Sequence, residues 1–70
     1  MLGYRCYFFD PDWRVLTVRD FHAGGDAEAI VTARTLSSEH KPHGFELWQG
    51  MRQVLREVLE DALRRDARHG

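Results

Sequence analysis

The sequence predicts a small α+β domain in which a sheet of three strands, or four in an alternative reading, carries a helix on one face. Three observations support this class. Two aromatic and β-branched segments flank an Asp-Pro turn, an alanine-rich helical pattern follows paired glycines, and a short alternating segment comes after Pro42. Seventy residues suffice for one domain. We therefore expect a single domain over residues 1–70 with the element order β-β-α-β-α.

The first two predicted strands form a hairpin. The segment Tyr4–Asp10 (YRCYFFD) is short and rich in aromatic residues, and Trp13–Phe21 (WRVLTVRDF) is rich in β-branched and aromatic residues, as strands are. Between them, Pro11 suits the second position of a turn, and the aspartates on either side suit its neighbouring positions. The two strands are therefore predicted to be antiparallel.

A helix is predicted to start after the glycine-rich loop HAGGD. Asp26 suits the N-cap, and Glu28 adds negative charge in the first turn, where the helix dipole favours it. The segment SSEHKPHG (residues 37–44) ends the helix, because Pro42 disfavours helical geometry in the residue before it. The small side chains of the apolar face predict a helix close to the sheet; that face consists of Ala29, Ile30, Ala33 and Leu36.

The segment Phe45–Trp48 (FELW) alternates and is predicted to be the third strand, which a right-handed crossover can place parallel to the second. Beyond Gly50, adjacent apolar pairs recur every four residues with Arg and Glu between them. This period favours a C-terminal amphipathic helix over residues 51–67, from Met51 to Ala67. The alternative is a hairpin in which Gln-Gly turns and RQVLREV forms a fourth strand. The helical period is the stronger signal, so we expect the helix.

Composition and charge limit the functional classes. Ten Lys and Arg balance eleven Asp and Glu, whereas nucleic-acid-binding proteins usually carry a basic excess. Cys6 is the one cysteine, so no disulfide forms within the chain, and its apolar segment is typical of a buried thiol in a reducing compartment. We see no signal peptide and no apolar run of roughly 18 residues. We expect a cytoplasmic protein that binds neither nucleic acid nor membranes.

No residue pattern typical of catalysis or of a cofactor is evident. His40 and His43 have a spacing that suits a metal, but no Cys or acid completes a zinc pattern. Asp10, His22 and Cys6 are the candidates for acid–base or nucleophilic chemistry, and nothing in the sequence places them together. We therefore expect a protein that is not an enzyme and has no catalytic, metal-binding or cofactor-binding residues.

Both faces of the first predicted strand carry aromatic rings, because its segment YRCYFF alternates. In the second strand, Leu16 and Val18 are expected on one side and Trp13 and Val15 on the other. A short helix covers only one face of the sheet, so either the C-terminal helix or a second copy of the chain covers the other. We favour a homodimer, because small domains without disulfides gain stability from oligomerisation, and another protein is a further partner class. The expected interface residues are Tyr7, Phe9, Trp13, Val15, Trp48, Leu55 and Leu59.

Three segments, YRCYFFD, DAEAIVTAR and ELWQG, resemble the pattern of a family of short bacterial proteins of uncharacterised activity. That pattern reads YRxYFxD, DxEAIxxAR and ELWxG, and the resemblance covers Tyr4 to about Gly50. It implies no activity. Members usually have glycine in the first turn, where this chain has Trp13, and often end soon after the last motif, which favours the alternative fourth strand. A weaker likeness of the hairpin and helix to HicB-type antitoxins implies an antitoxin-like or regulatory module as the alternative function.

Overall fold

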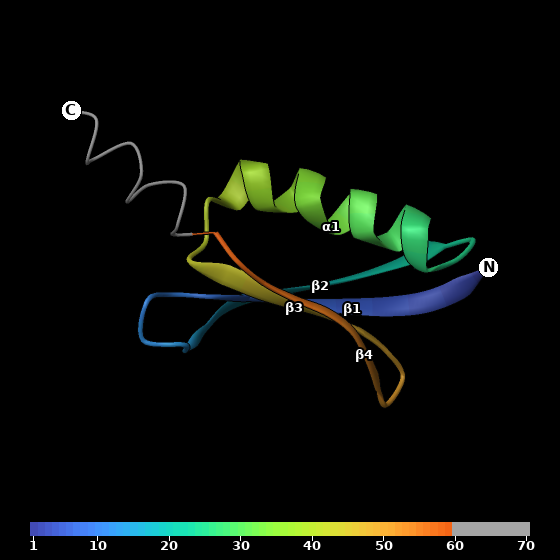
Figure 1. Cartoon of the computed structure of the whole chain (residues 1–70), viewed down its shortest axis with the longest axis horizontal. Coiled ribbons are helices and arrows are strands. Elements are labelled where there is room, and N and C mark those ends of the chain that lie inside the picture. Colours follow the sequence, from blue (N-terminus) through green and yellow to red (C-terminus); the bar gives the residue numbers. More distant parts are fainter. Residues whose placement is uncertain (60–70) are drawn as a thin grey trace.

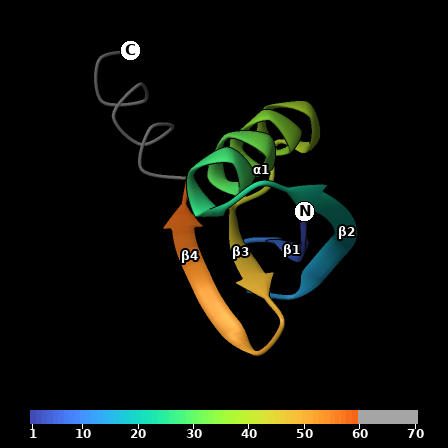
Figure 2. The same ribbon diagram turned by 90° about the vertical axis from the view of Figure 1, so that its right-hand side faces the viewer.

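The computed structural model describes residues 1–59, which form four strands and one helix. The strands pair antiparallel throughout, in the order β2-β1-β3-β4. Figure 1 shows α1 along one side of this sheet. The helix lies across one face of this sheet, and no element within residues 1–59 covers the other face (Figure 2). The α+β class is therefore confirmed. The elements are β1 (Leu2–Phe9), β2 (Val15–Ala23), α1 (Asp26–His40), β3 (Gly44–Gln49) and β4 (Arg52–Val58).

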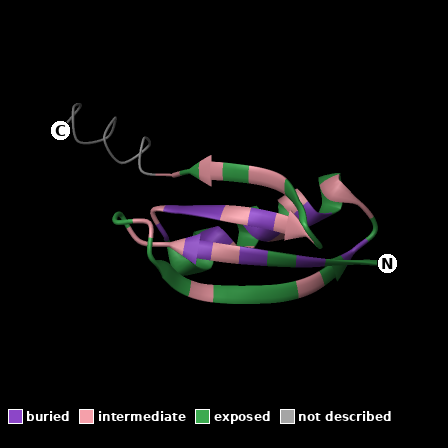
Figure 3. Ribbon diagram, turned by 90° about the horizontal axis from the view of Figure 1, so that it is seen from below, coloured by how far each residue is buried: buried purple, intermediate pink, exposed green. Residues whose placement is uncertain are grey.

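The core lies between α1 and the sheet (Figure 3). The helix can approach the sheet closely because Ala29, Ala33 and Ser37 occupy its buried side. Ile30 and Leu36 pack against the core from the same helix, so the predicted helix face is confirmed. The sheet contributes every second residue of the central strands. The core residues are Tyr4, Cys6, Phe8, Ala23, Ala29, Ala33, Phe45 and Leu47.

Asp10 organises the turn between β1 and β2. Its carbonyl oxygen accepts a hydrogen bond from the N–H of Trp13 (2.9 Å), as in a β-turn with proline at its second position. Its Oδ1 accepts from the N–H groups of Asp12 and Arg14 at 2.9 Å each. The predicted hairpin is thus confirmed. However, β2 begins at Val15, because Trp13 has a φ of 60°, which a strand residue does not adopt.

A β-bulge in β2 changes which of its side chains share a face. The pairing shifts by one residue between Phe8 and Phe9, which leaves Leu16 as an extra residue in β2. Val15 and Val18 consequently both lie on the face away from α1. Regular alternation predicted that these two valines lie on opposite faces. The prediction was wrong because alternation holds only where the strand contains no bulge.

The start of α1 differs from the prediction, because Gly25 and not Asp26 is the N-cap. The carbonyl oxygen of Gly25 accepts the N–H of Ala29 (3.0 Å), and no side chain caps the helix. Instead, Oε1 of Glu28 reaches back to accept the N–H of Gly24 (2.7 Å). Asp26 is the first helical residue, so its carboxylate is available for contacts with the sheet.

The end of α1 lies at His40, beyond the stop predicted from Ser37 onward. Ser37 and Ser38 remain helical, and their hydroxyls donate to helix carbonyls three or four residues earlier. Lys41 then takes a left-handed conformation with a φ of 51°, and its N–H donates to the carbonyl oxygen of Ser37 (2.7 Å). Pro42 follows, consistent with its predicted role as a helix breaker.

Strands β2 and β3 run in the same direction, because both are antiparallel to β1. The predicted parallel orientation of the second and third strands is therefore confirmed. They are not neighbours, however, since β1 lies between them. The connection through α1 thus crosses over β1, and this crossing brings the helix onto the sheet.

The predicted C-terminal helix over residues 51–67 is wrong for its first part. Residues 52–58 form β4, and residues 60–67 lie outside the described residues. The alternative hairpin is correct, with Gly50 and Met51 as its two-residue turn between the paired Gln49 and Arg52. Gly50 has a φ of 63°, which glycine adopts without steric cost. The order of the elements is therefore β-β-α-β-β.

A second β-bulge explains the misleading helical period. Leu47 pairs with Leu55, but Trp48 pairs with Gln53, so Val54 is an extra residue in β4. Val54 and Leu55 both pack against the core, although they are adjacent in the chain. Two neighbouring apolar residues that face the core are typical of a helix, and here the bulge produces the same pattern in a strand.

Candidate functional site

The face of the sheet opposite α1 is the candidate functional site, and we call it the open face. Its members follow from the strand register, because directly opposed residues of an antiparallel pair project to the same side. The central rows pair Asp20 with Arg5 and Val18 with Tyr7. The open face includes Arg5, Tyr7, Phe9, Val15, Val18, Asp20, His22, Glu46, Trp48, Arg56 and Val58, with Trp13 beside Phe9.

One end of the open face, next to the β1–β2 turn, is rich in apolar groups, and we call it the hairpin end. The ring of Trp13 lies 5.0 Å from that of Phe9 between centroids, and the guanidinium carbon of Arg56 lies 4.2 Å from the centre of the Trp13 ring. This distance is typical of a cation–π contact. Val15 and Val58 add apolar surface there, with 52% and 40% of their surfaces exposed.

Gly44 makes room for the indole of Trp13. A Cβ at Gly44 would lie 2.9 Å from Cη2 of Trp13 and 2.6 Å from the carbonyl oxygen of Glu57, both closer than real Cβ contacts. His43, the preceding residue, meets the Trp13 ring edge-on at 5.3 Å between centroids. The start of β3 therefore serves as the support on which the indole lies.

The other end of the open face contains a hollow of about 390 Å³. The hollow lies beside Gly3, which has no side chain, and hydrogen bonds hold the side chains of Arg5 and Trp48 at its border. Arg5 is drawn toward β2 by two hydrogen bonds to Asp20 (2.7 and 3.0 Å), while Nε1 of Trp48 donates to Glu46 (3.1 Å). The hollow is lined by Gly3, Tyr4, Arg5, Tyr7, Asp20, Phe21, His22, Trp48 and Gly50.

The charges of the open face are paired within it. Besides the Arg5–Asp20 pair, Arg56 approaches Glu46 at 3.5 Å. The hydrogen bonds from Arg5 lower the pKa of Asp20, and those to Asp20 and Tyr7 raise the pKa of Arg5, so this pair stays charged over the physiological range. The Arg5–Asp20 pair is exposed to water, so it adds little stability, whereas Glu46 of the other pair is half-buried. The main consequence of the two ion pairs is that the positive charges of the two arginines balance the negative charges of the two acids on this face.

Five of the seven predicted interface residues lie on or beside the open face: Tyr7, Phe9, Trp13, Val15 and Trp48. Leu55 and Leu59 do not, because both pack against the core on the helix side. Val18, Arg56 and Val58 also belong to this face but were not among the predicted interface residues. Val18 was missed because of the bulge in β2, and the other two because β4 was taken for a helix.

The three residues considered for acid–base or nucleophilic chemistry are not brought together. Cys6 is fully buried beneath α1, and burial raises the pKa of its thiol to about 12. His22 lines the hollow, whereas Asp10 holds the β1–β2 turn at the opposite end of the sheet. Within residues 1–59, no group of three or more His, Cys, Asp or Glu side chains is placed to hold a metal ion.

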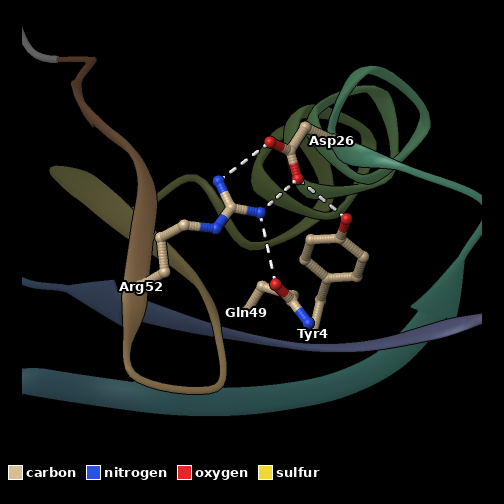
Figure 4. A network of polar contacts seen from close by, with 4 residues as sticks. All are labelled: Tyr4, Asp26, Gln49 and Arg52. Carbon is tan, nitrogen blue, oxygen red and sulfur yellow. Dashed lines mark hydrogen bonds and ion pairs between the residues drawn. The ribbon is translucent and has the colours of Figure 1, made fainter.

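A polar network joins the start of α1 to three strands of the sheet (Figure 4). The hydroxyl of Tyr4 donates to Oδ1 of Asp26 at 2.8 Å. Arg52 donates to both oxygens of Asp26 at 2.9 and 3.0 Å and to Oε1 of Gln49 at 3.2 Å. The hydrogen bonds from Arg52 and Tyr4 lower the pKa of Asp26. These hydrogen bonds connect α1 with β1, β3 and β4, so the network has a structural role.

No protein-family model, no curated protein and no solved structure matches the chain. In the part of the chain that the structure describes, the helix is neither long nor apolar enough to cross a membrane.

Proposed function

We propose that the chain is a non-catalytic protein-interaction module that forms a homodimer by packing the open face of one copy against that of another. The observation that carries this proposal is that, within residues 1–59, α1 covers one face of the sheet and no element covers the other. The half-buried rings of Tyr7, Phe9 and Trp13 lie on the side away from α1, next to the exposed valines. Apolar surface of this kind usually marks an interface in a small protein.

The charges of the open face support a second copy as its occupant. A homodimer brings identical surfaces together, so unbalanced charge on them would repel. Here each arginine is matched by a carboxylate of the same face, in the pairs Arg5–Asp20 and Arg56–Glu46. The same pairing disfavours single-stranded nucleic acid, the other polymer that packs on aromatic rings of an open sheet, because Asp20 and Glu46 would repel phosphates.

The test is the solution mass of the wild type and of Tyr7→Asp, measured by light scattering on a sizing column. Tyr7 lies on β1 near the middle of the open face and is only partly exposed. We expect the wild type to have twice the chain mass and Tyr7→Asp to have the mass of one chain, because the new carboxylate would be buried without a partner. The control Val31→Asp adds the same charge on the exposed side of α1, where 64% of Val31 is accessible, and should remain a dimer.

Two outcomes would overturn the proposal. One is a wild type that is monomeric at every concentration tested. The other is a dimer that dissociates equally with Val31→Asp and with Tyr7→Asp. In that case the added net charge, and not its position on the open face, would cause the dissociation. A monomer whose tryptophan fluorescence is quenched by a single-stranded oligonucleotide, with a loss of binding at high salt, would assign the open face to nucleic acid instead.

A further inference from the structure

Trp13 holds a backbone conformation that favours glycine. Its φ of 60° lies in the left-handed region, where a bulky residue is an outlier. The surrounding hydrogen bonds enforce this conformation, because Asp10 accepts the N–H groups of Trp13, Asp12 and Arg14. Glycine would complete the same turn without strain. A tryptophan here therefore costs the fold stability unless its side chain contributes something else.

The side chain of Trp13 does not offset this loss of stability by packing in the core. The buried cluster lies between α1 and the face of the sheet that α1 covers, and Trp13 is not part of it. Its indole instead lies on the open face against Phe9 and Arg56, with Gly44 leaving room for it, and it remains partly exposed. Strained residues that persist without a folding role are concentrated at binding sites.

We infer that Trp13 is the anchor of the homodimer contact, which is therefore centred on the hairpin end of the open face; this inference rests on the proposed function. Tryptophan and arginine are the side chains most enriched at the centres of interfaces, where less critical apolar contacts surround them and exclude water. Trp13 and Arg56 are stacked here, and Val15 and Val58 flank them with exposed surface. The end that contains the hollow, with Arg5, Asp20 and His22, forms the polar rim.

The test compares three variants by the dissociation constant of the dimer, measured by sedimentation. Trp13→Gly relieves the strained turn while removing the indole, and we expect a folded monomer, with the dissociation constant raised by about 100-fold or more. Val15→Lys and His22→Lys form a matched pair, since both residues are exposed and lie on β2 on the open face. We expect Val15→Lys to raise the dissociation constant by about tenfold or more and His22→Lys by less than about threefold.

The outcomes separate this inference from the proposed function. If Tyr7→Asp dissociates the dimer but folded Trp13→Gly remains a dimer, the proposed function stands and the anchor is wrong. If Trp13→Gly fails to fold, the matched pair decides, and an effect of His22→Lys equal to or larger than that of Val15→Lys overturns the inference. If the wild type is monomeric, the proposed function and the inference fall together.

Discussion

The conformation and contacts of Trp13 and Asp26 depend on the residues around them in space, and not on residue type alone. Trp13 follows the apparent strand pattern, yet the hydrogen bonds of Asp10 place it in a turn with a positive φ. Asp26 likewise suits an N-cap by its type. Its carboxylate instead binds Arg52 and Tyr4, because Gly25 precedes it as the cap.

The stability that Asp26 contributes to the fold is expected to depend on pH. Arg52 and Tyr4 hydrogen-bond its ionised carboxylate, which lowers its pKa in the folded protein. A lowered folded pKa gives stability that is present above the ordinary pKa of an aspartate, about 3.9, and is lost as the pH falls through the folded value. We expect Asp26→Asn to lower the free energy of unfolding at pH 7, with a difference from wild type that shrinks below about pH 4.

Urea denaturation at a series of pH values, followed by circular dichroism, measures this difference. Glu39→Gln is the control, because it removes a carboxylate from the exposed side of the same helix. A difference between wild type and Asp26→Asn that persists unchanged in acid would show that the ion pair is not its origin.

At the scale of elements, the approach of α1 to the sheet depends on small side chains. Ala29 and Ala33 are fully buried where the helix faces the core, and Ser37 continues their row. Large sheet residues, Phe8 and Phe45, fill the space opposite. The interior is close-packed, so no room remains for a longer side chain on this side of the helix.

We therefore expect Ala33→Leu to destabilise the fold by about 1–3 kcal/mol, because the added carbon atoms push the helix away from the sheet. Val31→Leu is the matched control, since it enlarges an exposed side chain on the same helix and should change stability by less than about 0.5 kcal/mol. Chemical denaturation of both variants measures these effects. Equal stability of the two variants would contradict the close packing.

At the scale of the whole molecule, residues 1–59 form two layers, a four-stranded sheet and a helix that covers one of its faces. The helix protects the core, while the rings and valines of the open face rely on the proposed second copy. A chain of 70 residues buries a modest part of its surface alone, so the contribution of a partner to its stability is large in proportion.

This arrangement predicts that stability depends on protein concentration. Binding between folded copies stabilises the folded state by mass action, whereas a monomer unfolds at the same temperature at any concentration. We expect the thermal midpoint of the wild type to rise over about a hundred-fold increase in concentration, and that of Tyr7→Asp to stay constant. Scanning calorimetry or circular dichroism at several concentrations measures this, and a constant midpoint for the wild type would contradict the homodimer.

Part of the open face was accessible from the sequence. Alternation in YRCYFF placed Tyr7 and Phe9 on one side correctly, because this segment contains no extra residue. The contributions of Val18, Arg56 and Val58 were not accessible. A bulge inserts one residue into a strand, and no particular residue type marks it in this sequence. It moves every later side chain to the other face.

A few neighbouring residues were sufficient to predict three local elements. These are the Asp-Pro hairpin, the helix with its small-residue face, and the third strand. The tertiary structure decides that residues 52–58 form a strand. Their apolar pairs suit a helix or a bulged strand equally, and the choice follows from β3, which offers them an edge to pair with. It also decided that Trp13 lies on the open face, since that placement depends on Gly44 and Arg56, which are distant in the chain.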